Sequence, residues 1–348
     1  MALDFKRRVI TSEFESPFDN FNTVKISGET RICPLSGHVT RLLPFRIKEF
    51  VKYDLNLLIE RSKKMGCPFC PEFIESKTAR FSKVLGPGRE RISFKDTVIF
   101  PNAFPYEEYS AVAVITKEHF LTPGQFSPLL LGQALQACQI YFQRVKGVSP
   151  TVRQALINWN YMPLAGSGLV HPHIQLLAMI EPTFYHRLVI ESQQRYEDEG
   201  GGSIFDDLVA KEQEDQQRYM SQIGYWHWLA AFAPRGIYEF WAIFSRDSDI
   251  LEMEERDNSD LALGINAILR FFEQKGIQAF NMCWYSFYKP GSRGLRNMIS
   301  IVPRISLPPL EVSDSNYFDR LHGESFTFIV PEDAAQEVRG YFPENSGD

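Results

Sequence analysis

The chain has 348 residues, 44% of them hydrophobic and 23% charged, as expected for a globular protein that buries a core without disulfides. Its net charge of −6 and the lack of any long lysine or arginine run argue against a nucleic-acid partner. It shows no apolar signal-peptide core at Met1–Ile10, no run of the roughly 18 apolar residues that a membrane span needs, and five scattered cysteines, so we expect a cytoplasmic protein without a membrane partner.

The first sixty residues predict an irregular arm followed by short strands. Within them, Arg31–Arg46 contains a Pro-Leu-Ser-Gly turn and then an alternating stretch that is typical of a strand. A helical pattern follows at Phe50–Lys64, and it leads into the sequence CPFC at Cys67 to Cys70.

Two blocks of the chain then show the same order of elements, strand–strand–helix–strand–strand. The first block is predicted at 96–100, 110–116, 124–145, 155–160 and 170–179, and the second at 228–233, 238–244, 258–275, 279–287 and 297–304. We therefore predict an α+β fold in which two repeats form a mainly antiparallel sheet with helices packed on one side. Chance similarity within an α+β chain is the alternative explanation of this order.

A polar helical stretch at 191–221, interrupted by Gly200–Gly202, lies between the blocks, and we interpret it as a solvated connection. The carboxyl-terminal part of the chain contains a strand-like segment at Phe326–Val330. A short helix is predicted to begin at Pro331, because proline is favoured in the first turn of a helix.

The most distinctive local feature is the sequence HPHIQ, from His171 to Gln175. Residues two apart on a strand point to one face, so His171, His173 and Gln175 would lie together. Pro172 cannot donate to a sheet ladder, which predicts an edge or a bulge there. The turn at 166–168 (Gly-Ser-Gly) can bring backbone amides close to a phosphate. The pattern favours phosphate chemistry, although a structural histidine pair or a metal clip would also produce it.

The CPFC sequence is either half of a zinc site or a redox pair. A thioredoxin-type motif follows a strand and opens a helix, whereas Cys67 and Cys70 follow a helical pattern and precede Pro71, which favours zinc. Zinc needs two further ligands, and His119 and His171 are the histidines in suitable contexts. The other histidines that we considered lie in unremarkable contexts: His38, His186, His227 and His322.

These motifs together resemble the galactose-1-phosphate uridylyltransferases, the transferase branch of the histidine-triad superfamily. CPFC is similar to that family's first zinc ligand pair, and the TKEH that ends at His119 is similar to its third ligand. Asn160 stands before HPHIQ at the spacing of the family's nucleotide-contacting asparagine. Two further segments match, Pro101–Pro105 and the Pro-Leu-Ser-Gly turn followed by Arg46. The resemblance covers the first half closely, to about residue 180, and the second half mainly in layout.

The resemblance implies one structural zinc ion per chain, held by Cys67, Cys70, His119 and His171. Four protein ligands leave no open coordination position for catalysis. Zinc on His171 would fix the backbone two residues before His173 and so aim the second imidazole.

The resemblance also implies that His173 attacks the α-phosphorus of a nucleotide sugar and that Gln175 binds a phosphate oxygen. An imidazole with an ordinary pKa near 6.5 is a competent nucleophile at pH 7. The UMP or AMP group would then pass to a sugar 1-phosphate, as in the UDP-glucose–hexose-1-phosphate uridylyltransferases of galactose metabolism. The remaining implied contacts are Arg46, Asn102, Phe104, Asn160, Gly166, Ser167 and Gly168 for the nucleotide and its phosphates, and Tyr317 and Asp319 for the sugar.

Several positions depart from the family pattern. Met298 and Ser300 stand where bacterial members carry histidines of a second metal site, so we expect no second metal. A family serine is replaced by Gly168, with Ser167 as a substitute, and the glutamine expected after Asp319 is missing, which puts galactose itself in doubt.

Other functions therefore stay open. A phosphorylase that uses inorganic phosphate on a nucleotide sugar or a dinucleoside polyphosphate would share this mechanism, and an inactive zinc-stabilised binding protein or a CPFC redox protein would not. The resemblance further implies two histidine-triad-like repeats, 1–185 with the zinc site and HPHIQ and 186–348 with a degenerate motif. It also implies a homodimer in which the amino-terminal arm and the carboxyl-terminal segment reach the partner's site.

Overall fold

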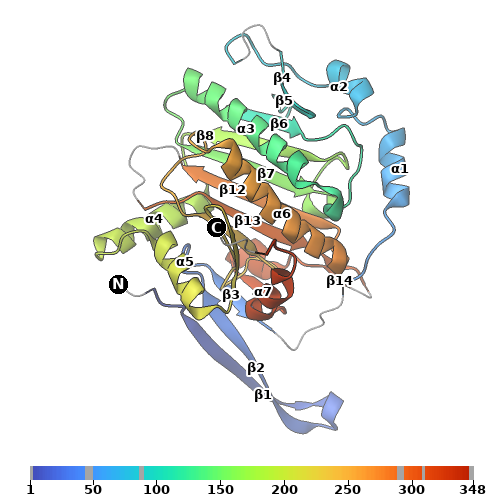
Figure 1. Ribbon diagram of the computed structural model, residues 1–348. Helices are drawn as coiled ribbons and strands as arrows, with labels where there is room; N and C mark the ends of the chain where they lie inside the picture. Colours follow the sequence, from blue (N-terminus) through green and yellow to red (C-terminus); the bar gives the residue numbers. More distant parts are fainter. Residues whose placement is uncertain (1–2, 44–49, 86–89, 288–293, 308–309, 345–348) are drawn as a thin grey trace.

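The computed structural model describes residues 3–43, 50–85, 90–287, 294–307 and 310–344 (Figure 1). Its largest sheet consists of β4 (Ile92–Phe94), β5 (Thr97–Pro101), β6 (Tyr109–Val114), β7 (Gln154–Tyr161), β8 (His173–Met179), β9 (Tyr219–Ile223), β10 (Trp226–Ala230), β11 (Phe240–Phe244), β12 (Ala279–Phe287) and β13 (Met298–Arg304). The strand order is β4-β5-β6-β8-β7-β12-β13-β11-β10-β9, and every neighbouring pair is antiparallel. The predicted α+β class with a mainly antiparallel sheet is confirmed.

The strand order is mirrored about the central β7–β12 pair. The sequence of neighbours β5-β6-β8-β7 on one side has its counterpart in β10-β11-β13-β12 on the other. In each half a long helix connects the second strand to the next, α3 (Pro128–Val148) after β6 and α6 (Glu255–Lys275) after β11. This is the order that the sequence predicts, and α6 ends as expected at Gly276, whose φ is +74°. The division into two domains at residue 185 stays a prediction.

The two long helices lie side by side across one face of the sheet (Figure 1). Large apolar side chains of the central strands, such as Trp159, Phe280 and Trp284, are fully buried in the core on that face. Because side chains alternate along a strand, the intervening residues point to the opposite face, and there they include Asn160 and Asn281. The fold therefore presents a row of polar groups on the face that α3 and α6 leave uncovered.

Part of this second face is covered by α4 (Phe184–Asp198) and α5 (Ile204–Asp215), which build a smaller core with Leu229 and Trp241. The polar stretch predicted at 191–221 thus forms two helices, and Gly200, with φ +88°, lies between them. The last helix, α7 (Pro331–Arg339), begins at Pro331 as predicted. No helix in the described part of the chain has both the length and the apolar character that a membrane span requires.

The prediction for the amino-terminal residues is wrong. Instead of an irregular arm, β1 (Arg7–Ser16) and β2 (Asn22–Ile32) form a long antiparallel hairpin that projects from the body (Figure 1). It joins a second sheet through β3 (Val39–Leu42), which pairs in parallel with β16 (Ser325–Thr327). Charged residues pair across the two strands, such as Lys25 with Glu13 at 3.0 Å. Because the hairpin is so polar, its sequence lacks the apolar alternation from which a strand is predicted.

The helix predicted at Phe50–Lys64 is shorter than expected, since α1 spans only Asn56–Lys64. The sequence did not predict α2 (Pro71–Lys77), which begins directly after the CPFC sequence. Pro172 does not lie at an edge, because β8 is an interior strand between β6 and β7. It directly precedes the first residue of β8, so its missing N–H removes no bond from the ladder, and its carbonyl accepts from Ile115 N at 3.4 Å.

A buried carboxyl group in α5 predicts a pH-dependent stability. Glu212 is fully buried and accepts from Arg218 Nε at 2.9 Å, and Arg218 also pairs with Glu332 of α7. Burial raises the pKa of Glu212 to about 7, so the folded protein holds this proton more tightly than the unfolded chain does. The free energy of unfolding should therefore fall as pH rises from about 4.5 to about 7, by roughly 3 kcal/mol at most.

Glu212→Gln should remove this part of the pH dependence, since glutamine can still accept from Arg218 but does not titrate. Urea unfolding of both proteins at about pH 5 and about pH 8 measures the difference. If the variant loses as much stability between these two pH values as the wild type does, the assignment to Glu212 is wrong.

Candidate functional site

Four buried side chains meet near the amino-terminal end of β8. Cys67 and Cys70 lie between α1 and α2, His119 follows β6, and His171 precedes β8. Their ligand atoms all lie within 4.8 Å of one another. Cys70 Sγ is 3.2 Å from His119 Nδ1 and 3.6 Å from His171 Nδ1. The four residues predicted as metal ligands are therefore brought together.

Hydrogen bonds fix both imidazoles in the orientation that a metal needs. His171 Nε2 lies 2.9 Å from the carbonyl oxygen of Thr116, which can only accept, so Nε2 carries the proton. His119 Nε2 lies 2.6 Å from Ser62 Oγ, whose own proton goes to the carbonyl of Ile59. In both rings the lone pair is consequently on Nδ1, the atom that faces the thiols. Two thiols and two such nitrogens form the donor set of a tetrahedral structural zinc site.

The ionisation of these ligands fits a metal as well. Burial lowers the pKa of His171 to about 4 and lowers that of His119, so both rings are neutral and able to coordinate. Burial, together with the neighbouring Cys67, raises the pKa of Cys70 to about 12. A bound cation would reverse this shift, because its charge favours the thiolate over the thiol.

His173 is the first residue of β8 and is paired with Val114 of β6. Its Nδ1–H donates to the carbonyl oxygen of His171 at 2.8 Å, so the lone pair is on Nε2. No described residue hydrogen-bonds to that Nε2. Burial lowers the pKa of His173, whose side chain is among the buried polar groups with 7% exposure. The ring is therefore a neutral imidazole whose Nδ1 is anchored and whose Nε2 has no hydrogen-bond partner among the described residues, and it is buried rather than part of the lining of a cavity described for this chain.

A residue that the sequence analysis missed connects the two histidines. Phe69, between the two cysteines, lies edge-on to His173 with ring centroids 5.1 Å apart, and it also contacts His171 at 6.3 Å. Phe100 of β5 packs behind it at 5.4 Å. An apolar residue at the third position of CPFC was the available signal. The loop that carries the thiols is thus packed directly against the imidazole of His173.

The polar face continues from His173 to Gln175 and Asn160. Gln175 is paired with Asn158 of β7, and continuing this register by two residues places Asn160 opposite His173. A Cβ atom added to Gly166 would lie 4.0 Å from Asn160 Nδ2, so the Asn160 amide group faces the glycine turn. This turn, Asn160 and His173 consequently surround one region of the sheet surface.

The turn itself is less available to a ligand than the sequence suggests. The amide of Gly166 donates to Pro163 O at 2.9 Å, and that of Ser167 to Met162 O at 3.3 Å. The Ser167 hydroxyl donates to the carbonyl of Leu169 at 2.6 Å, and the side chain is buried. Gly168 is exposed, and a Cβ atom there would meet nothing within 4 Å.

The predicted base contacts lie farther along the sheet. Asn102 follows β5 and accepts from the amide of Phe104 at 3.0 Å, and the Phe104 ring is 84% exposed. The register places the neighbouring Pro101 level with Leu176 of β8. Leu176 is three residues beyond His173 on the same strand, about 10 Å along it. Arg46 lies outside the described residues.

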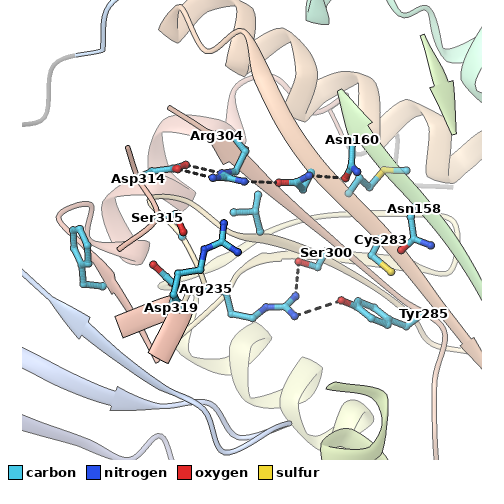
Figure 2. Close-up of a pocket in the computed structure, with 16 residues that line it drawn as sticks. Asn158, Asn160, Arg235, Cys283, Tyr285, Ser300, Arg304, Asp314, Ser315 and Asp319 are labelled. Carbon is cyan, nitrogen blue, oxygen red and sulfur yellow. Dashed lines mark hydrogen bonds and ion pairs between the residues drawn. The ribbon is translucent and has the colours of Figure 1, made fainter. Parts of the chain in front are cut away.

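A cavity of about 470 Å³ opens on the polar face, over β12 and β13 (Figure 2). Asn160 lines this cavity, and on the sheet it also lies opposite His173. Its other polar lining residues are Asn158, Arg235, Asn281, Tyr285, Ser300, Arg304, Asp314, Ser315, Asp319 and Arg320. Asp319, predicted as a sugar contact, lines the cavity. Tyr317, which is 59% exposed and lies tilted against Phe318, is not among the lining residues.

Most residues of this cavity were not predicted from the sequence. Its signal was an alternation of polar residues along β12 and β13, which include Asn281, Tyr285, Ser300 and Arg304. At Ser300, one of the two positions at which the resemblance led us to expect no second metal, Arg235 donates to the hydroxyl at 2.9 Å, and the hydroxyl donates to Glu239 at 2.7 Å. A hydrogen-bonded group thus fills this position.

Comparisons with known proteins find one relative by sequence and several proteins of the same fold. No family model matches the chain. An uncharacterised protein from Archaeoglobus fulgidus is 30% identical over 316 residues, which are 91% of this chain and 93% of that protein.

Three solved structures share the fold at low sequence identity. A GalT-like protein from Arabidopsis thaliana has a TM-score of 0.69 and 15% identity, covering 89% of this chain and 98% of its own. An ADP-glucose phosphorylase from Arabidopsis thaliana with bound ADP-glucose has a TM-score of 0.71 and 15% identity, covering 90% and 99%. A uridylyltransferase has a TM-score of 0.64 and 17% identity, covering 90% and 98%.

Proposed function

Because the chain belongs to one family with the Archaeoglobus fulgidus protein and has the fold of the GalT-like proteins and ADP-glucose phosphorylase, we propose that it is a divergent nucleotidyltransferase of the galactose-1-phosphate uridylyltransferase type. It transfers a nucleoside monophosphate from a nucleotide sugar to a phosphorylated acceptor through a covalent intermediate on His173. The observation that carries this proposal is the His173 ring, whose Nδ1–H is bonded to a backbone carbonyl and whose Nε2 has no hydrogen-bond partner among the described residues.

The reaction has two displacements. The Nε2 lone pair attacks the α-phosphorus, a P–N bond forms, and the P–O bond to the leaving sugar 1-phosphate breaks. The imidazole gains a positive charge, which the bond from Nδ1–H to the His171 carbonyl stabilises. A phosphate oxygen of the acceptor then attacks the same phosphorus, and the P–N bond breaks to restore the neutral ring. Both leaving and attacking groups are phosphates whose second pKa is near 6, so no strong general acid is required.

The cluster of Cys67, Cys70, His119 and His171 is proposed to hold one zinc ion. Support comes from the S2N2 donor set and from the two Nε2–H bonds that leave each Nδ1 lone pair facing the thiols. With four protein ligands, zinc supplies structural rigidity and no open site for chemistry. It would tie the loop that carries Phe69 to the strand that carries His173.

Gln175 and Asn160 are proposed to hold the phosphate oxygens, since both lie on the sheet face of His173. Gly168 can bring the turn close to a phosphate, because its exposed position has no side chain in the way. Gly166 and Ser167 shape this turn, whereas Asn102, Phe104 and Arg46 remain the proposed contacts of the nucleotide. The leaving sugar would extend into the cavity beside Asp319, with Tyr317 at its outer side.

Two enzyme classes share this mechanism and differ only in the acceptor that takes the nucleotide from His173. A sugar 1-phosphate acceptor makes the protein a transferase that could act in galactose metabolism, and inorganic phosphate makes it a phosphorylase. The second class is a candidate because the ADP-glucose phosphorylase shares the fold at a TM-score of 0.71. The base, uridine or adenine, is open in both.

Isotope exchange separates these possibilities. The protein is incubated with UDP-glucose or ADP-glucose and with either labelled galactose 1-phosphate, labelled glucose 1-phosphate or labelled inorganic phosphate. Label that enters UDP-glucose or ADP-glucose from glucose 1-phosphate reports the first displacement, which both classes share. We expect label from galactose 1-phosphate, an acceptor that differs from the leaving group, to enter a nucleotide sugar, which identifies a transferase. Label in a nucleoside diphosphate would instead identify a phosphorylase. No transfer in any arm would contradict the proposed function and favour a binding protein.

We further propose that the protein is a cytoplasmic homodimer built on two histidine-triad-like repeats, 1–185 and 186–348. The mirrored strand order about β7 and β12 supports two repeats. Support for a dimer is the projecting β1–β2 hairpin, which exposes Phe18 at 99% and Phe21 at 67%. Sedimentation of the intact protein, and of a variant with both rings replaced by serine, tests the dimer.

A further inference from the structure

A chain of hydrogen bonds runs from the far wall of the cavity to Asn160 (Figure 2). Asp314 accepts two bonds from Arg304, from Nε at 2.8 Å and from Nη2 at 2.8 Å. Arg304 Nη1 donates to Asn281 Oδ1 at 3.3 Å, and Asn281 Nδ2 donates to Asn160 Oδ1 at 2.7 Å. The chain joins the residue that follows β15 (Val312–Ser313) to the strand beside His173.

Only one orientation of the two amides satisfies this chain. A guanidinium group only donates, so the oxygen of Asn281 must face Arg304 and its nitrogen must face Asn160. The same Nδ2 also donates to the carbonyl of Ala165 at 2.9 Å, which can only accept and so requires the same orientation. Asn160 must therefore present its oxygen to Asn281, which leaves its own Nδ2 as the outward donor.

That outward donor points to the place where a phosphate would bind. Asn160 Nδ2 lies 4.0 Å from the position of a Cβ atom on Gly166, and no described residue accepts from it. An amide nitrogen attracts a phosphate oxygen, whereas an amide oxygen in the same place would repel it. The direction of this single amide therefore decides whether Asn160 helps or hinders an anion.

We propose that Asn281, Arg304 and Asp314 are positioning residues that hold the Asn160 amide with Nδ2 toward the phosphoryl group. This inference rests on the proposed function, because it assumes that a nucleotide phosphate lies beside His173. Asp314, at the far end of the chain of hydrogen bonds, is held in place. It also accepts from Ile305 N at 3.1 Å, and its side chain is only 8% exposed. The two strands that carry Asn281 and Arg304 are paired along seven residues, from Ala279↔Arg304 to Tyr285↔Met298.

Asn281→Asp tests the proposal with little change of shape. The carboxylate can still accept from Arg304, but it can donate neither to Asn160 nor to the Ala165 carbonyl. The Asn160 amide therefore turns to donate to it and presents its oxygen to the phosphate. Binding of AMP and UMP, measured by calorimetry, should weaken about tenfold or more. Binding of adenosine and uridine should stay unchanged, because a nucleoside has no phosphate.

Two comparisons separate positioning from added charge and from general damage. Ser315→Asp places one negative charge in the same cavity outside the chain of bonds, and it should weaken AMP and UMP binding less than Asn281→Asp does. In a protein that already carries Asn160→Ala, Asn281→Asp should cause a much smaller further loss, since the effect through Asn160 is already gone and only the bond to Ala165 is left to lose.

The possible results are distinct. Unchanged AMP and UMP affinity in Asn281→Asp, an equal loss of nucleoside affinity, an equal loss in Ser315→Asp, or additive losses with Asn160→Ala would each overturn the positioning role alone. A wild-type protein that bound neither AMP nor UMP would overturn the proposed function itself, and the positioning role with it.

Discussion

Replacing His173 with alanine should abolish nucleotidyl transfer, with kcat reduced by at least about 10⁴-fold. The variant loses the proposed nucleophile, and His171 cannot replace it, since its Nδ1 faces the thiols and its Nε2 is bonded to Thr116. The affinity for the nucleotide should change little, because Asn160 and Gln175 are still present. The rate of label exchange at saturating nucleotide sugar measures the loss.

The matched control is His322→Ala, which removes an exposed histidine at the end of the segment Phe318–His322. This histidine is not among the residues that line the cavity, and its replacement should keep kcat within about twofold. A His173→Ala protein that retained more than about one hundredth of the wild-type rate would show that another group attacks the phosphorus.

Of the stability changes predicted here, loss of the proposed metal should be the largest. Cys70→Ser should remove the bound zinc and lower the free energy of unfolding by about 3–5 kcal/mol, because zinc binding to a folded site is itself folding free energy. The exchange rate should fall as well, since Phe69 would no longer be held against the His173 ring. Elemental analysis of the purified protein and urea unfolding give the two quantities.

Cys138→Ala is the control for replacing a buried cysteine. Cys138 lies in α3, fully buried and away from the cluster, so this variant should keep one zinc ion per chain and lose only the stability of a small cavity. If wild-type protein contained no zinc, or if Cys70→Ser kept its zinc, the proposed metal site would be contradicted.

The sequence predicted the metal cluster and the imidazole because short motifs carry them. HPHIQ places two histidines close together at the beginning of one strand, and CPFC places two thiols in one loop. Each motif therefore brings two of the site residues together through its own short spacing. The strands and helices of the main sheet were also predicted because their apolar patterns are strong, as in β12, whose bounds 279–287 were predicted correctly.

The rest depends on contacts between distant parts of the chain. The chain from Asp314 to Asn160 joins residues that are far apart in sequence, and only the pairing of β12 with both β7 and β13 brings them together. No local pattern tells that the Asn281 amide faces Arg304 rather than solvent. In the same way, Ser167 matched the expected phosphate contact in residue type, yet its hydroxyl is bonded to Leu169 within the turn.

The most direct test of the account is mass spectrometry of the intact protein after exposure to UDP-glucose, ADP-glucose and related nucleotide sugars. We predict an acid-labile adduct with the mass of one nucleoside monophosphate, which peptide mapping assigns to His173 and which disappears when the acceptor is added. An adduct on any other residue, or transfer of the nucleotide without any adduct, would contradict it.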